Sequence, residues 1–319
     1  MAGIWIFAEE KELVLELLTP GGELAARQGG KLTIVVPEAE GDPADYFAAG
    51  ADEVVLLSPL AEDVTLGAWL PVLAGEIRAA DPEAVLLAAT SRGKEIAARL
   101  AARLETGLAS NCLSLAADAD GTLVMERLAY GGAALQRVAV MGRPVMATIP
   151  PRTFPPAAAA AIPGREGSVR TLPPPPADAV RVVARKEKER SAQDITAAKT
   201  VVCVGRGLEK REDLELARQL AAALGGEIGC TRPISEELHW LPDNLCIGLS
   251  GVQVKPELYL GLGVSGQIQH LTGLRGARLI CAVNRDPNAP IFLAADLGII
   301  GDLYEVTPKL IEEVKKIRG

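Results

Sequence analysis

Short apolar runs alternate with stretches of helical apolar pattern along the first half of this chain, and this alternation limits the fold more than any other feature. The runs at residues 3–8, 31–36, 53–57 and 84–89 are rich in Val, Ile, Leu or Ala, which predicts buried strands. Helices between successive strands imply right-handed βαβ units. The sequence therefore predicts the α/β class, with a mostly parallel sheet flanked by helices.

Further elements of this region follow from the same patterns. A helix over 13–28 should be interrupted at Pro20, because proline and the paired glycines after it break helical periodicity. Residues 113–117, 123–129 and 133–141 predict antiparallel strands added to the sheet. The remaining predicted elements are helices at 43–49, 66–80 and 95–104 and a strand at 144–149.

Residues 90–94 (TSRGK) open the helix at 95–104 with a capping residue and two cations. Such a helix start either uses the Thr90 side chain as a cap or holds a phosphate. Capping is the preferred interpretation, because caps of this kind are common. The spacing of a P-loop is absent.

Prolines indicate where the chain divides. Residues 150–178 contain Pro-Pro pairs, an alanine run and four consecutive prolines, a composition that argues against regular helix or sheet and favours an extended connector. Residues 180–184 are predicted to add a final strand, and the mixed-charge run 185–190 is interpreted as a solvated segment. These features predict an N-terminal α/β domain over 1–190 and a second domain over 191–319.

The second domain repeats the alternation of strand and helix. A helix over 212–224 should end at Gly225, and a closing helix should begin with Thr307 as N-cap and Pro308 at its first position. Polar residues follow several strands, at the carboxyl ends where parallel sheets bind ligands. The predicted strands are 200–204, 227–230, 246–249 and 279–283.

Composition narrows the class of partner and of site. The formal net charge of -8 argues against nucleic acid, whose phosphates require a basic surface. The five cysteines form no C-x-x-C pair and there are only two histidines, so reduced buried thiols are favoured and no metal site is predicted. No apolar run is long enough to span a membrane, and no signal peptide opens the chain. We therefore expect a cytoplasmic protein without membrane insertion.

Residues 261–266 match G-x-G-x-x-G, a pattern that is weak alone. No apolar strand runs directly into Gly261, and no acidic residue stands where a ribose partner is expected, so an NAD site is rejected. The residues instead predict a tight turn followed by a helix that begins near Ser265. The free N–H groups of such a helix suit a phosphate or an electron-rich ring edge.

Several short motifs occur together in the last third of the chain: Ser250-Gly251, KPELY at 255–259, GVSG at 263–266, Gln269-His270 and NRD at 284–286. This region resembles the flavin-binding signature of the electron transfer flavoprotein alpha subunit, and looser similarity covers most of the chain. The resemblance implies that the second domain is a Rossmann-like FAD-binding domain. The residues that it places at FAD are Arg206, Thr231, Arg232, Ile247, Gly248, Leu249, Ser250, Ser265, Gly266, Gln267, Ile268, Gln269, His270, Asn284, Asp302 and Leu303.

The resemblance also implies roles for some of these residues. Ser250 matches the position that hydrogen-bonds the flavin N5. His270, as an imidazolium or N–H donor, and Arg232 would stabilise negative charge on the reduced ring. The alternatives are a core or capping position for His270 and a surface salt bridge for Arg232. Asn284 and Asp302 match positions near the adenosine half, with turn formation as the alternative for each.

The function implied by the resemblance is that of an electron carrier, the FAD-carrying alpha subunit of a heterodimer whose beta subunit packs on the N-terminal domain. Electrons would come from NADH or from a flavin dehydrogenase such as an acyl-CoA dehydrogenase of fatty acid oxidation. They would pass to a quinone reductase, a ferredoxin or another acceptor, and electron bifurcation is left open. Two alternatives are a flavoenzyme with its own substrate and a nucleotide-binding regulator. The absence of a nucleophile–base pair or carboxylate dyad near the motifs counts against the first.

Overall fold

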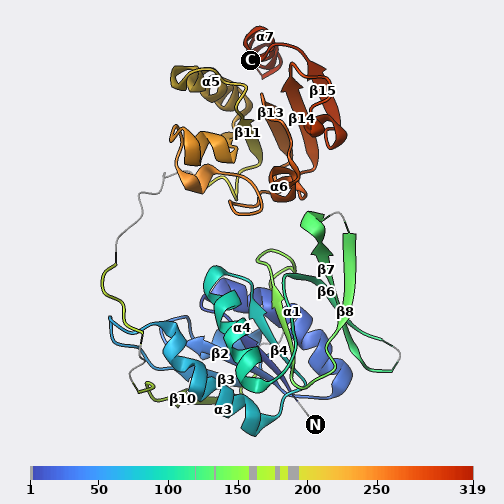
Figure 1. Cartoon of the computed structure of the whole chain (residues 1–319). Coiled ribbons are helices and arrows are strands. Elements are labelled where there is room, and N and C mark those ends of the chain that lie inside the picture. The colour runs from blue at the N-terminus through green and yellow to red at the C-terminus, as the bar shows by residue number, and fades with distance from the viewer. Residues whose placement is uncertain are drawn as a thin grey trace. The chain divides into compact units, whose positions relative to one another are not determined.

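A computed structural model describes residues 3–118, 120–132, 134–157, 164–176, 180–185 and 194–318. The chain divides into two compact units, residues 1–185 and 186–319. Each unit contains a parallel sheet with helices packed against it (Figure 1), which confirms the predicted α/β class. The predicted boundary at 190–191, most of the charged run 185–190 and parts of the predicted connector lie outside the described residues.

The first unit is built on a seven-stranded parallel sheet with the order β10-β3-β2-β1-β4-β9-β5. Its strands are β1 (Ile4–Phe7), β2 (Leu32–Pro37), β3 (Glu53–Leu57), β4 (Ala84–Ala88), β5 (Leu108–Ala109), β9 (Val145–Ile149) and β10 (Ser168–Leu172). Its helices are α1 (Lys11–Gln28), α2 (Pro43–Ala48), α3 (Leu70–Ala80) and α4 (Ser91–Leu104), with 3-10 turns at Leu66–Trp69 and Tyr130–Gly132.

Both faces of this sheet are buried, which explains why its strands are apolar at consecutive positions. In β1, Ile4 and Ile6 enter the cluster that α1 and α2 cover, whereas Trp5 and Phe7 enter the cluster that α3 and α4 cover. Each strand therefore supplies apolar side chains to two separate cores. The four helices are held by these cores rather than by their own propensity.

Helix α1 is continuous through Pro20, so the predicted interruption is wrong. Leu17, Leu18 and Leu24 on its inner face are buried against the sheet. The absence of a side chain at Gly21 lets the helix approach β1, because a Cβ there would lie 2.7 Å from Ile6 Cδ1. Burial of this face outweighs the hydrogen bond that the proline cannot make.

Three antiparallel strands follow, β6 (Cys112–Ala117), β7 (Leu123–Ala129) and β8 (Ala134–Ala139). They were predicted as additions to the main sheet, but they form a separate sheet with the order β6-β7-β8 (Figure 1). Most of the β8 positions are exposed, and its neighbours Tyr130 and Met141 are 85% and 95% exposed. The first unit therefore has one sheet with two covered faces and one with a largely open strand.

The predicted connector also differs from the structure. Its segment Ser168–Leu172 contains no proline and forms β10, which pairs in parallel with β3. Arg170 fixes this edge strand through ion pairs of 2.7 Å to Glu53 and 2.6 Å to Glu76. Residues 180–184 do not form the predicted strand, since Arg181 makes only an isolated bridge with Val64. The proline-rich composition on both sides of β10 led to the prediction of a connector, although this short segment pairs with a strand far away in the sequence.

The second unit is built on a five-stranded parallel sheet with the order β12-β11-β13-β14-β15. Its strands are β11 (Thr200–Val204), β12 (Glu227–Cys230), β13 (Leu258–Leu262), β14 (Leu279–Asn284) and β15 (Leu297–Ile300). Its helices are α5 (Leu214–Leu224), α6 (Ile268–Leu271) and α7 (Leu303–Arg318), and α5 packs on α7. Short helical turns lie at Arg211–Asp213, Pro233–Glu237, Asp243–Leu245, Thr272–Leu274 and Pro290–Leu293.

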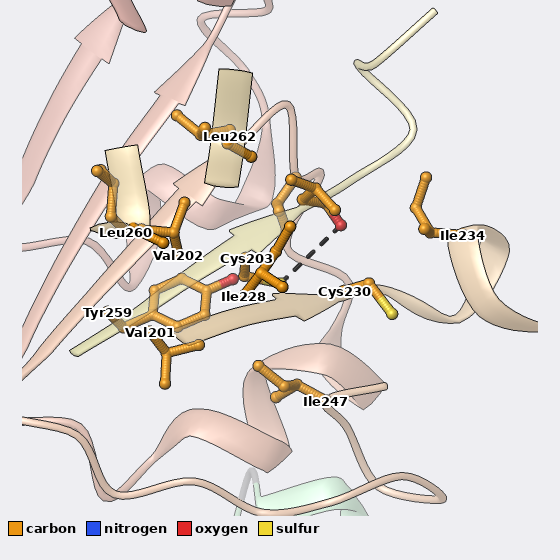
Figure 2. Packing of buried hydrophobic residues seen from close by; sticks show 14 of the residues in the cluster. Val201, Val202, Cys203, Ile228, Cys230, Ile234, Ile247, Tyr259, Leu260 and Leu262 are labelled. Carbon is orange, nitrogen blue, oxygen red and sulfur yellow. Dashed lines mark hydrogen bonds between the residues drawn. The ribbon is translucent and has the colours of Figure 1, made fainter. Parts of the chain in front are cut away.

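The core of this unit centres on β11 and β13, the middle of the sheet. Val201, Cys203 and Tyr259 are fully buried there, and Ile228 of β12 and Ile247 pack in the same cluster (Figure 2). Aliphatic side chains and thiols fill most of this core. Tyr259 is the largest of its fully buried side chains.

Three predicted elements of the second unit begin or pair differently. Residues 246–249 make isolated bridges rather than a strand. Helix α6 begins at Ile268 and has four residues, so no long helix begins near Ser265. Helix α7 begins at Leu303, one turn before the predicted cap Thr307, because Asp302 Oδ1 accepts the Tyr304 N–H at 2.8 Å. None of the helices in the described ranges is long and apolar enough to cross a membrane.

Candidate functional site

The five strands of the second sheet end at nearly the same level. Val204 of β11 pairs with Cys230 of β12 and with Leu262 of β13, and Leu262 pairs with Val283 of β14. The strand order reverses direction between β11 and β13, and parallel sheets bind ligands beyond the carboxyl ends of the strands at such a point. The loops that follow these strands carry the residues predicted for the cofactor.

The loops after β11 and β13 touch each other through their backbones. Gly207 N donates to Gly263 O at 3.0 Å. A Cβ at Gly205 would lie 2.4 Å from Gly263 O, and a Cβ at Gly207 would lie 2.6 Å from Gly263 Cα. Glycine is therefore required on both sides of this contact. The contact lies at the carboxyl ends of β11 and β13.

The loop after β13 directs its carbonyls inward. Val264 O accepts from Asn284 Nδ2 at 2.8 Å, and Ser265 O accepts from Ile291 N at 3.0 Å. Within the described residues, the N–H groups of residues 264–267 have no hydrogen-bond acceptor. Successive unpaired backbone N–H groups in a glycine-containing loop are the type of donor that binds an anion.

Gly266 fixes the course of this loop. Its φ is 78°, in the left-handed region, and a Cβ there would lie 2.3 Å from both the N and the Cα of Ile291. No other residue type fits at this position without moving the turn at Pro290–Leu293. The exposed side chains of Ser265, Gln267 and Gln269 extend from the same loop and from the start of α6.

The segment 247–250 lies at the same carboxyl edge of the sheet as the loop after β13. Ile247 N donates to Cys230 O at 2.9 Å, and Leu249 N donates to Gln269 O at 2.7 Å. The segment is thereby tied to β12 and to α6 at once. Beyond these ties Ser250 is exposed, and its hydroxyl has no partner in the described part of the chain, so it is free to donate to a ligand.

The two arginines of the predicted site form ion pairs with their own neighbours. Arg206 lies 3.1 Å from Glu237, and Arg232 lies 2.8 Å from Glu236. The less favoured alternative for Arg232, a surface salt bridge, is therefore what the structure has. Exposed pairs of this kind are worth about 0–1 kcal/mol, so a bound anion can replace the carboxylate as partner.

His270 is the buried member of the predicted set, 7% exposed. Its Nδ1 lies 2.9 Å from Ile247 O and its Nε2 lies 2.7 Å from the Tyr259 hydroxyl. Burial lowers the pKa of His270 to about 4. Of the two predicted forms of His270, imidazolium and N–H donor, the structure therefore has the neutral ring near pH 7.

The remaining predicted residues support the loops. Thr231 is buried, with its N–H donating to Val204 O at 3.0 Å. Ile247, Gly248 and Leu303 are buried, and Ile268 is 46% exposed. Asn284 and Asp302 both act as turn or cap residues, the alternative considered for each, because their side chains bond to backbone atoms. All sixteen predicted residues nevertheless lie along one edge of one sheet.

One residue of the KPELY motif contacts the predicted site but was not selected as a site residue from the sequence. Tyr259 lies inside β13, and its hydroxyl reaches the His270 ring from within the core. No apolar strand was predicted to run into Gly261, and that prediction is wrong, because β13 covers Leu258–Leu262 and is almost entirely buried. The available signals were its place in the KPELY motif and Gly261, which leaves space for a large neighbouring ring.

Comparisons with known proteins agree with this geometry. The sequence profile of the electron transfer flavoprotein domain matches residues 4–177, and that of the electron transfer flavoprotein FAD-binding domain matches residues 194–275. The chain belongs to the electron transfer flavoprotein family, as an alpha-type subunit. Members of this family carry electrons, and membership of the family indicates pairing with a beta subunit.

Relatives of the alpha-type subunit match along nearly their whole length. The protein FixB of Salmonella typhi is 35% identical over 311 residues, which cover 97% of each chain. The protein FixB of Escherichia coli O139:H28 is 36% identical over 310 residues, covering 97% of this chain and 96% of the relative. The YdiR subunit of Escherichia coli K12 is 34% identical over 322 residues, covering 98% of each chain.

The second family profile makes FAD the cofactor of this alpha-type subunit. The edge of the second sheet fits that cofactor on its own geometry. The N–H groups of residues 264–267 suit the two phosphates, and the free Ser250 hydroxyl suits a ring nitrogen. The glycines at 205, 207 and 263 keep side chains away from the floor between these groups.

Proposed function

We propose that the second unit binds FAD along the carboxyl edge of its sheet and that the chain carries electrons as the alpha subunit of a heterodimer. It would shuttle them between NADH or a flavin dehydrogenase, such as an acyl-CoA dehydrogenase, and a quinone reductase, a ferredoxin or another acceptor. The observation that carries this proposal is the set of unpaired N–H groups at residues 264–267, at the same edge of the sheet as the free hydroxyl of Ser250.

FAD supplies the one- and two-electron redox chemistry when it is bound. In our proposal the backbone N–H groups of residues 264–267 hold the pyrophosphate, and Gln267 and Gln269 contact the chain between phosphate and ring. The Ser250 hydroxyl donates to the ring edge. Arg232 turns from Glu236 towards the ring and supplies positive charge, which favours the reduced, anionic cofactor.

The separate sheet of the first unit is the proposed contact for the beta subunit. Tyr130, Leu135 and Met141 are 85%, 59% and 95% exposed around β8. A cavity of about 430 Å³ lies between this sheet and residues 105–109, and the buried Nε of Arg127 has no partner in the described residues. Exposed apolar side chains beside an unsatisfied cation suit a protein partner that brings both apolar groups and an acceptor.

The proposed function is tested with the full chain co-expressed with its beta subunit. The expected complex is yellow and contains FAD bound by the alpha subunit, and it passes electrons from a reduced flavin dehydrogenase to an acceptor dye. Ser250→Ala should change the midpoint potential of that flavin, whereas Ser168→Ala, which removes an exposed hydroxyl of the first unit, should not. A colourless complex that takes up no FAD would refute the proposal.

The same purification addresses electron bifurcation. A second flavin recovered with the beta subunit supports a bifurcating complex, whereas AMP recovered there opposes it. Turnover of an organic substrate by the isolated chain would instead favour a flavoenzyme with a substrate of its own.

A further inference from the structure

The guanidinium of Arg127 in β7 is not neutralised within the described part of the chain. Its Nε is buried and has no hydrogen-bond acceptor there. None of the ion pairs among the described residues includes Arg127. Arginine keeps its charge at physiological pH, and a buried N–H without an acceptor costs free energy. The chain therefore holds a charged donor here that its own described residues do not satisfy.

The register of the separate sheet turns this side chain inwards. Leu123 and Met125 lie on the same face of β7 as Arg127, because side chains alternate along a strand. Both are buried in the core of the first unit. Arg127 is the third member of this row and lies opposite Gln136 of β8. A row that begins as apolar core thus ends in a cation.

Arg127 lines the cavity of about 430 Å³ between the separate sheet and residues 105–109. Among the described lining residues, the only other ionisable group is Glu105, which is exposed just after the end of α4. Glu105 does not neutralise the cation, since no ion pair of Arg127 is formed in the described ranges. The cavity therefore has room for an acceptor that this chain does not provide.

A carboxylate is the acceptor that fits this donor best. It neutralises the guanidinium and accepts two parallel N–H bonds from its planar fork, which a single carbonyl or hydroxyl oxygen cannot do. Met141 lines the same cavity and is 95% exposed. An acidic side chain of a protein brings apolar neighbours that cover Met141, whereas a small free anion leaves this apolar surface in water.

We propose that Arg127 is an anchor of the heterodimer, and that an Asp or Glu side chain of the beta subunit enters this cavity and pairs with its guanidinium. This proposal deepens the proposed contact for the beta subunit and rests on it. A bidentate pair fixes orientation as well as distance, so this pair would set how the two subunits dock. Arg127 would then contribute little to the folding of its own chain and much to association.

Arg127→Met separates these two contributions, because it keeps an apolar side chain and removes the charge. Thermal unfolding of the full chain alone should show no loss of stability, since a buried cation without a partner is replaced. Affinity for the beta subunit should fall about 100-fold, because the partner's carboxylate is left buried and unpaired. A destabilised free chain, or an unchanged affinity for the beta subunit, would overturn the proposal.

Arg137→Met is the matched control for this variant. Arg137 of β8 is exposed and lies opposite Glu126, on the other face of the same sheet from Arg127. Its replacement should change the affinity for the beta subunit by less than about threefold. Equal losses of affinity in the two variants would mean that the general charge of the sheet matters and that no anchor exists.

Arg127→Lys identifies the partner group directly. A carbodiimide joins an amine to a carboxylate in contact with it and adds no spacer, so the new amine should be linked to one Asp or Glu of the beta subunit. Mass spectrometry of the treated complex detects this link, and Arg137→Lys should give none. A link to Glu105 of the same chain, or no link at position 127, would refute the anchor. If the wild-type chain forms no heterodimer, the proposed function itself fails.

Discussion

The loops that follow β4 in the first unit and β13 in the second occupy equivalent places, each at the carboxyl end of a central parallel strand. In the first, Thr90 Oγ1 accepts from Gly93 N at 2.9 Å and its hydroxyl donates to Glu9 at 2.5 Å. The capping interpretation of Thr90 is thereby confirmed. In the second, the N–H groups of residues 264–267 have no acceptor among the described residues.

This difference shows that a parallel sheet with helices does not by itself make an anion site. A capping hydroxyl uses a free donor of the first loop, and the Glu9 carboxylate beside it repels an anion. In the second loop Asn284 and Ile291 bond to the carbonyls of Val264 and Ser265, and the N–H groups of residues 264–267 have no acceptor among the described residues. An anion site requires backbone N–H groups that the loop itself leaves without an acceptor.

Gly266→Ala should give the largest effect and would break the second loop. Alanine would have to adopt the left-handed φ of Gly266, and its Cβ would lie 2.3 Å from the backbone of Ile291. We expect FAD affinity to fall about 100-fold and the second unit to lose about 3 kcal/mol of unfolding free energy. Binding titration and thermal unfolding check both values.

Gly121→Ala is the matched control for this change. Its φ of 81° imposes the same backbone conformation, but nothing lies within 4 Å of the new Cβ. It should cost only about 1 kcal/mol and leave FAD binding unchanged. Equal losses in the two variants would show that the contact with Ile291 is unimportant.

The pH dependence of stability should separate the two units, because both histidines belong to the second. An unfolded histidine titrates near pH 6.5, and burial lowers the pKa of His270 to about 4. Between these values the unfolded chain binds more protons, so the second unit is fully stabilised above about pH 6.5. It should lose up to about 1.4 kcal/mol per pH unit as the pH falls towards 4.

His270→Gln isolates this contribution, since the carboxylates titrate alike in both proteins. The variant should unfold more easily at pH 7 but lack the extra slope between about pH 6.5 and 4. Chemical denaturation at several pH values measures it. Parallel pH profiles for the two proteins would contradict a neutral, buried His270.

Thr90→Ala tests the first of the two compared loops, the one after β4, and should have a smaller effect on stability than Gly266→Ala. Loss of the cap should lower the stability of the first unit by about 1 kcal/mol, because Gly93 N loses its acceptor. FAD affinity should remain at the wild-type value. A loss of FAD affinity in this variant would mean that the first loop also takes part in binding the cofactor.

Glu236→Gln should give the smallest effect. It releases Arg232 from an exposed ion pair, so we expect FAD to bind about two- to fivefold more tightly with little change in stability. Glu313→Gln, which breaks the exposed pair with Lys316, is the control and should leave binding unchanged. Weaker binding in Glu236→Gln alone would assign Glu236 itself to the ligand.

Sequence patterns predicted most strands of both sheets, because each is a short apolar run between turn residues. They failed where partners far along the chain decide the outcome. Segment Ser168–Leu172 became β10 through pairing with β3, and α1 continued through Pro20 because its inner face is buried. A local sequence pattern shows neither which strand a segment will pair with nor how deeply a helix face will be buried.

The sequence by itself determined the α/β class, the glycines of the second edge and the set of residues that lies there. These follow from local composition and from motifs that keep their order along the chain. Only the tertiary structure decided the state of each side chain. Arg232 is paired with Glu236, and His270 is neutral between Tyr259 and Ile247. Charge and hydrogen-bond direction depend on burial and on partners brought together by folding, which no run of residues specifies.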